Sequence, residues 1–195
     1  MTTAAHRTLP ILVLMLAVFF PTSVRGQQVL CLDEADDIAA LQIFEHALNT
    51  YVELHRRVEL PLSARYLSSD PEAAAEAAAR LAAAIREARP DAERGEIFRP
   101  EVADLFRFRL ANTAAAHDYA QSEPAADDEG APAVRLRVNH AVPWIVSRPA
   151  WPALVRALPT LPLEVEYRIV NRDLVLVDVA ANIVVDVLDE ALPAR

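Results

Sequence analysis

The sequence contains no lysine, only three glycines and a single cysteine. The shortage of glycine excludes the usual nucleotide-binding loops, which need two or three closely spaced glycines to cradle phosphates. A single cysteine excludes a disulfide within the chain, so we interpret Cys31 as a free thiol or an intermolecular link. The absence of lysine beside many alanines suggests a GC-rich genome and carries no chemical meaning.

Acidic residues outnumber basic ones, and the formal net charge is −9. Nucleic-acid binding needs a basic face that displaces counterions, so we expect no nucleic-acid partner. The same charge disfavours adsorption to anionic lipid, so we expect no membrane association of the mature protein.

The N-terminus has the order of a secretory signal peptide. A basic start carrying Arg7 precedes the apolar run Ile11–Phe20, and Pro21 and a small residue at Gly26 follow. The run is about half the ~20 residues that a membrane-spanning helix needs. We therefore predict a signal peptide over residues 1–26, with an uncleaved anchor as the alternative. Lipidation is disfavoured because no small residue precedes Cys31, and loss of Arg7 and Arg25 makes the mature charge −11.

Residues 27–120 are predicted to form a helical half. A stripe of apolar residues at helical spacing predicts a helix over 34–59 that includes Tyr51 and His55. A second helix is expected from the cap Asp70 to Pro90, since Ala73–Ile85 is almost all alanine. A third begins at Pro100 and fades near Tyr119.

Residues 121–133 are acidic and proline-bearing, which predicts an exposed linker or loop. Residues 134–195 are predicted to be a β-rich half that forms one compact domain with the helices. Alternating apolar residues predict strands over 134–138 and 163–169, and a third strand spans 174–177, with a turn at 171–173. A short helix is expected over 151–158, between prolines.

Complementary charges suggest which predicted strands are neighbours. Strand 134–138 carries Arg135 and Arg137, and strand 163–169 carries Glu164 and Glu166, so we expect the two strands to pair. The tail 179–192 fits both a strand and a helix, and its three- and four-residue spacing favours a helix. The predicted fold class is α+β: three N-terminal helices packed on a small antiparallel sheet of about three strands, with a short C-terminal helix.

The first candidate site comprises Asp178, Asn182 and Asp186, whose spacing of four places them on one side of either a helix or a strand. Paired carboxylates can perform acid–base chemistry or hold a cation. The alternative is a helix cap followed by a solvated face. His140 is the candidate histidine partner of Asp173, Asp178 or Asp186.

Other chemistry has little support in the sequence. The histidines follow no metal-binding pattern, so we expect no metal and no cofactor, and we interpret Tyr51 and His55 as a packing or hydrogen-bonding pair. Trp144 and Trp151 lie among prolines, where they are candidates for ligand binding. The alternative is that both tryptophans fill the seam between helices and sheet.

Two stretches resemble other proteins. Gly95–Val102 (GEIFRPEV) and Glu166–Leu176 (EYRIVNRDLVL), continuing to Asp178 and Asn182, resemble uncharacterised exported bacterial proteins with no assigned activity. The resemblance implies a bacterial envelope setting and carries over no catalytic residue.

Together these observations predict a periplasmic or secreted bacterial protein, soluble after signal cleavage. We expect a non-enzymatic binding or interaction module with a protein or small-molecule partner. A metal-independent hydrolase or lyase with a carboxylate–histidine site is the alternative, and an envelope structural protein is a third hypothesis. A cleft that holds a buried carboxylate beside His140 would favour the enzyme.

Overall fold

A computed structural model describes residues 34–62, 70–116, 135–143 and 147–193. These residues belong to one compact unit, Leu32–Arg195. The predicted signal peptide, Cys31, the 121–133 linker and Trp144 lie outside the described residues. No helix in the described ranges is long and apolar enough to cross a membrane.

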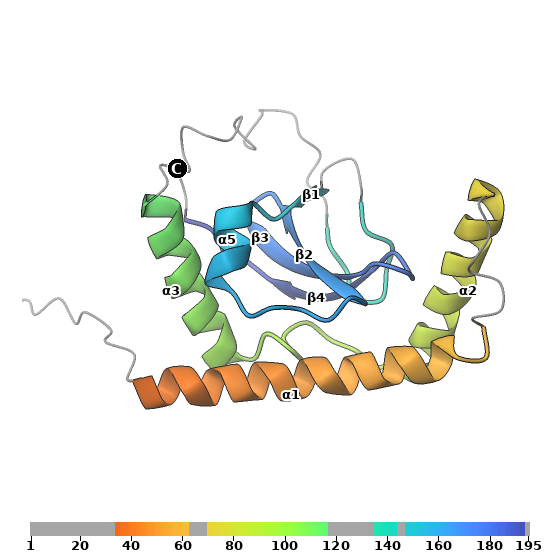
Figure 1. Ribbon diagram of the computed structural model, residues 1–195, viewed down its shortest axis with the longest axis horizontal. Helices are drawn as coiled ribbons and strands as arrows, with labels where there is room; N and C mark the ends of the chain where they lie inside the picture. Colours follow the sequence, from red (N-terminus) through yellow and green to blue (C-terminus); the bar gives the residue numbers. More distant parts are fainter. Residues whose placement is uncertain (1–33, 63–69, 117–134, 144–146, 194–195) are drawn as a thin grey trace, which may run out of the picture. The chain divides into compact units, whose positions relative to one another are not determined.

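The three N-terminal helices follow the sequence prediction closely. They are α1 (Glu34–Glu59), α2 (Pro71–Ala88) and α3 (Pro100–Ala116). Asp70 caps α2, and its side chain accepts a hydrogen bond from the backbone N–H of Glu72. In Figure 1, α2 and α3 rise from opposite ends of α1, and both contact it. The short helix α5 (Pro152–Ala157) also appears where the prolines predict it.

The sheet is antiparallel and has four strands in the order β1-β2-β3-β4. Its strands are β1 (Ser147–Pro149), β2 (Val165–Val170), β3 (Asp173–Asp178) and β4 (Ile183–Leu188). Asn171 lies in the β2–β3 turn with φ 56° and Asn182 in the β3–β4 turn with φ 56°. Asparagine tolerates this left-handed conformation, so the hairpins form without glycine. The α+β class is confirmed, with one more strand than expected.

The predicted C-terminal helix is wrong, because the chain forms β4 there. The apolar residues of the segment fit both the helical and the strand period. However, every residue of β4 is buried, and three of its six residues are valine. β-branched residues favour a strand. The preceding strand β3 also supplies a hydrogen-bonding edge along β4, with one register shift between Leu176 and Val177. The apolar spacing of this segment is compatible with both a helix and a strand, and pairing with β3 selects the strand.

The predicted strand 134–138 is also wrong, and so is the Arg/Glu pairing built on it. Residues 135–137 have no regular secondary structure, and the segment that follows runs beside β4, where Ala141 bridges Ile183. Strand β2 has β1 and β3 as its neighbours. Instead, Glu164 pairs with Arg56 of α1, and Glu166 pairs with Arg168 of β2 itself. The side chain of Leu136, which lies between the two arginines, is buried in the core and anchors this segment.

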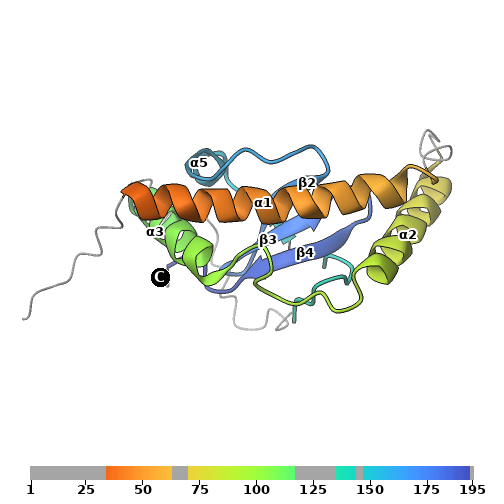
Figure 2. The same cartoon turned by 90° about the horizontal axis from the view of Figure 1, so that it is seen from below.

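Both faces of the sheet are covered by hydrophobic cores, and one core is larger than the other. The larger core lies between one face and the helices, and it contains a cluster of three aromatic rings, those of Phe44, Phe98 and Phe106. The smaller core lies on the other face, where Leu136 and Val142 cover valines of β2, β3 and β4. Figure 2 shows α5 and the coil around residue 140 on opposite sides of the sheet.

Candidate functional site

The predicted carboxylates Asp178 and Asp186 are both fully buried, so neither belongs to a solvated face. Asp178 pairs with Ile183 and Asp186 with Leu176, and all four residues lie on the helix-covered side of the sheet. Asn182 lies in the turn between the strands. The two aspartates share a face because of the hairpin, and each binds a different part of the molecule.

Asp186 holds the loop between α2 and α3. Its Oδ1 accepts hydrogen bonds from the backbone N–H groups of Gly95 and Val187, each at 2.8 Å. Its Oδ2 accepts from those of Ile97 and Phe98, also at 2.8 Å. Burial raises the pKa of Asp186, and the four amide donors limit that rise because they favour the ionised form. Every position around this carboxylate is occupied by backbone, so Asp186 positions a loop and has no room for a ligand.

Asp178 joins the end of β3 to helix α1. Its Oδ2 accepts a hydrogen bond from the Tyr51 hydroxyl at 2.6 Å and lies 2.5 Å from Nδ1 of His55. Its Oδ1 accepts from the backbone N–H of Ala181 at 2.7 Å. Tyr51 and His55 are one helical turn apart, so the same face of α1 presents both to one carboxylate. Tyr51 and His55 are thus joined through a shared carboxylate, which the sequence did not indicate as their partner.

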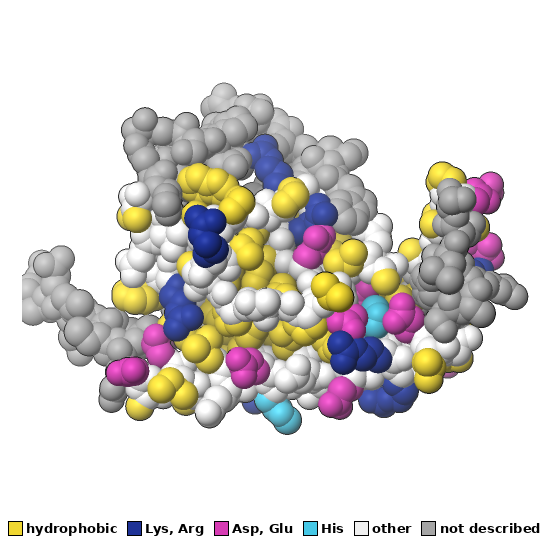
Figure 3. All heavy atoms as spheres, viewed as in Figure 1, with side chains coloured by type: hydrophobic (Ala, Val, Ile, Leu, Met, Phe, Trp, Pro, Cys, Tyr) yellow, Lys and Arg dark blue, Asp and Glu magenta, His cyan; other side chains and the backbone are white. Residues whose placement is uncertain are grey.

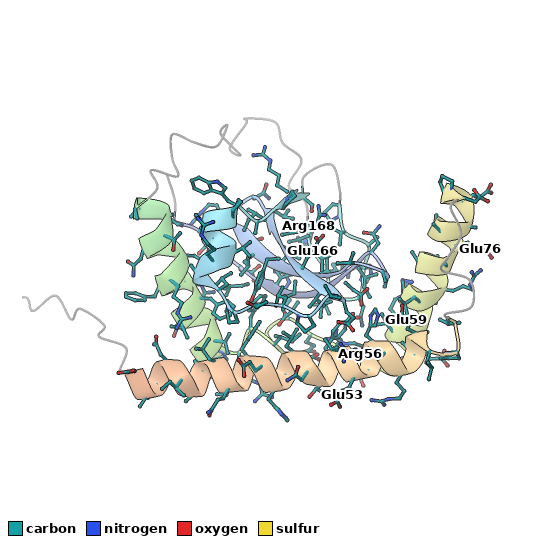
Figure 4. The ribbon with its side chains drawn as sticks, in the orientation of Figure 1. Glu53, Arg56, Glu59, Glu76, Glu166 and Arg168 are labelled. Atoms are coloured by element: carbon teal, nitrogen blue, oxygen red, sulfur yellow. The ribbon has the colours of Figure 1, made fainter. Side chains whose placement is uncertain are left out.

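His55 is 1% exposed and is surrounded by carboxylates. Its Nε2 lies 3.4 Å from Glu59 Oε2, so both ring nitrogens face acids. Glu164, bound to Arg56 at 2.5 Å, also acts on the ring through its charge. Figure 3 shows acidic side chains gathered around a histidine between the C-terminal part of α1 and the sheet, and Figure 4 places Arg56 and Glu59 there.

The pKa of His55 reflects two opposing effects. Burial lowers it, but the hydrogen bond to Asp178 and the charges of Asp178, Glu59 and Glu164 together raise it above its ordinary value. Burial is also the main cause that raises the pKa of Tyr51, and the neighbouring charge of Asp178 adds to it. Tyr51 thus remains a neutral donor, and the imidazolium form of His55 is favoured.

His140 does not meet a buried carboxylate. Its side chain is exposed, and Nδ1 lies 3.0 Å from the carbonyl oxygen of Val138. Asp173, the third carboxylate proposed as its partner, accepts a hydrogen bond from the backbone N–H of Glu190. Trp151 is half-buried and packs against the larger core at the start of α5, which fits a role in filling the seam. No group of three or more potential metal ligands converges in the described ranges.

A basic groove was missed by the sequence reasoning. It has a volume of about 950 Å³ and is lined by residues 92–94, 135–138 and 140, whose charged or titratable members are Arg94, Arg135, Arg137 and His140 together with the acidic Glu93. We call this surface the basic groove and define it by Arg94, Arg135, Arg137 and His140. The available signal is the strict alternation of arginine with apolar residues from 134 to 138, a pattern that predicts a strand.

Arg94 connects the segments that line this groove. Its guanidinium donates to the carboxylate of Asp189 and, at 2.5 Å, to the carbonyl oxygen of Leu136. Leu136 is buried in the smaller core, whereas Arg135 and Arg137 on either side of it are exposed. Neither of these two arginines forms an ion pair with another described residue. Both side chains are exposed, which makes them candidates for contact with an anion.

Comparison with known proteins adds no assignment, because no family model, no curated protein and no solved structure matches the chain.

Proposed function

We propose that the chain is an exported, non-enzymatic binding protein of the bacterial envelope that takes an anionic ligand in the basic groove. The observation that carries the proposal is the presence of Arg135 and Arg137, exposed and without ion-pair partners among the described residues, in a groove of about 950 Å³. A chain of net charge −9 has few reasons to gather basic groups on one surface. The predicted signal peptide over residues 1–26 supports export.

The chemistry of the ligand follows from the arginines. Guanidinium binds carboxylate and phosphate groups through paired hydrogen bonds. Arg135 and Arg137 flank the buried Leu136, and both line the groove. Two anionic groups on one ligand could each meet a guanidinium. The ligand is thus a small molecule or chain segment with at least two carboxylates or phosphates.

The geometry gives little support to the alternative of a hydrolase or lyase. The carboxylate–histidine pair in the described residues is Asp178–His55, and His55 is 1% exposed. Its second nitrogen faces Glu59 rather than an open cleft. A general base needs a free nitrogen within reach of the substrate.

Isothermal titration calorimetry tests the proposal with two probes, citrate for carboxylates and tripolyphosphate for phosphates. We expect at least one probe to bind, and more weakly as salt screens the charges. The double variant Arg135→Gln with Arg137→Gln should weaken that binding at least tenfold. The matched control, Arg57→Gln with Arg86→Gln, removes the same charge from exposed positions on α1 and α2 and should bind as the native protein does. Equal binding by both double variants, or no binding of either probe, would refute the proposal.

A further inference from the structure

The contact between α1 and the end of β3 contains more negative charge than its fixed cations balance. Three carboxylates, those of Asp178, Glu59 and Glu164, act on His55. Among the described residues, the one permanent cation bound to these carboxylates is Arg56, whose Nε lies 2.5 Å from Glu164 Oε1. Oε2 of Glu164 is buried and has no hydrogen-bond partner among the described residues. A second positive charge at this point would improve the balance.

The other charged and titratable groups nearby do not supply that charge. Arg89 lies 5.1 Å from the centre of the Tyr51 ring, and its guanidinium is bound to Glu96 at 2.6 Å. Tyr51 uses its hydroxyl proton for Asp178 and stays neutral. Protonation of His55 is therefore the change that can supply the missing charge.

Only the protonated ring satisfies both of its neighbours. An imidazolium has two N–H donors, and Asp178 and Glu59 each face one of its nitrogens, at 2.5 Å and 3.4 Å. A neutral ring keeps one N–H, and the buried Asp178 holds it. The lone pair on Nε2 would then face the carboxylate of Glu59, which is about one-third exposed and can turn to solvent.

We propose that protonated His55 is a pH-sensitive lock, which holds the last turn of α1 against the start of β2 and the end of β3 and opens as pH rises. When the ring is neutral, Arg56 remains bound to Glu164, but the repulsion between Glu59 of α1 and Glu164 before β2 is no longer offset by a charge on His55. The link through Asp178 persists, since Tyr51 still donates to it. The opening is thus local, and it involves Glu59 and Leu60 on one side and Glu164 and Val179 on the other, where the backbone N–H of Val179 donates to the Glu164 carbonyl.

Nuclear magnetic resonance of the full mature chain tests the lock between about pH 5 and pH 9. The imidazole nitrogens of His55 should titrate with a midpoint above about 6.5, the ordinary value for histidine. Backbone amide signals of Glu59, Glu164 and Val179 should shift with the same midpoint. His46→Gln, which changes an exposed histidine on the same helix, should leave that midpoint unchanged.

Two variants make the test decisive. His55→Gln should abolish the shared transition. Glu59→Gln changes a partly exposed residue, so it is expected to fold, and it should move the His55 midpoint to lower pH because it removes one of the stabilising charges. The lock is overturned if His55 titrates at or below the ordinary value, if Glu59→Gln leaves the midpoint in place, or if the amide transition survives in His55→Gln. Anion binding in the basic groove can fail or succeed independently of these results.

Discussion

Replacing Asp186 by asparagine tests the assignment of that carboxylate as the anchor of the α2–α3 loop. Each oxygen of Asp186 accepts two backbone N–H groups. The amide of asparagine has nearly the same shape, but one of its ends is a donor. Whichever way the amide turns, two buried N–H groups lose their acceptor and face another N–H.

An unsatisfied buried donor costs about 1–3 kcal/mol, so Asp186→Asn should lower the free energy of unfolding by about 2–6 kcal/mol. Domains of this kind are stable by about 5–15 kcal/mol, so the variant should be marginal. Urea denaturation followed by far-ultraviolet circular dichroism measures the difference. Asp104→Asn, at a carboxylate whose side chain is 68% exposed, is the control and should stay within about 0.5 kcal/mol of the native protein. A loss below about 1 kcal/mol in Asp186→Asn would refute the reasoning.

Three further predictions concern the same framework. Tyr51→Phe removes a donor to the buried Asp178 and should cost about 1.5–3 kcal/mol in urea denaturation, whereas Tyr167→Phe breaks only a 3.3 Å bond to a carbonyl and should cost less. Gly95→Ala places a side chain at φ +81°, so its melting temperature should fall by an amount equivalent to about 1–2 kcal/mol, and an unchanged value would contradict the assigned turn. Because the pKa of His55 is raised in the folded state, its stabilisation is complete below about pH 6.5 and is lost as pH rises through the folded pKa, so native stability should fall relative to His55→Gln over that range.

The helices could be predicted from the sequence because their signals are local. Asp70 and Pro71 define the start of α2 within two residues, and Pro100 defines the start of α3. Strand β4 could not be assigned in this way, because its apolar residues satisfy helical and extended spacing alike. Its conformation depends on pairing with β3, and the local spacing of one segment carries no information about that pairing.

In the candidate site too, individual residues could be identified from local sequence, but their long-range partners could not. Asp178 and Asp186 were identified as notable carboxylates, but their partners are far away in the chain. His55 is 123 residues from Asp178, and Gly95 is 91 residues from Asp186. No local pattern links residues at such separations. The position of Tyr51 and His55 one turn apart on α1 was visible in the sequence, whereas the carboxylate that joins them required the fold.

The basic groove could not be predicted because the sequence offers the two arginines acidic partners on another predicted strand. Arginines alternating with apolar residues usually indicate a half-buried strand, and the sequence predicts the glutamates of the next strand as their partners. In the structure those glutamates are bound elsewhere, one by Arg56 and one by Arg168. Arg135 and Arg137 are left facing the groove.

A crystal structure of the protein grown with tripolyphosphate, or with citrate if that probe binds more tightly, tests the central claim most directly. We predict density for the probe in the basic groove, with one anionic group within hydrogen-bonding distance of the Arg135 guanidinium and another near Arg137. Density for the probe at a different surface, or a groove in which both arginines make no contact with a bound probe, would contradict the account.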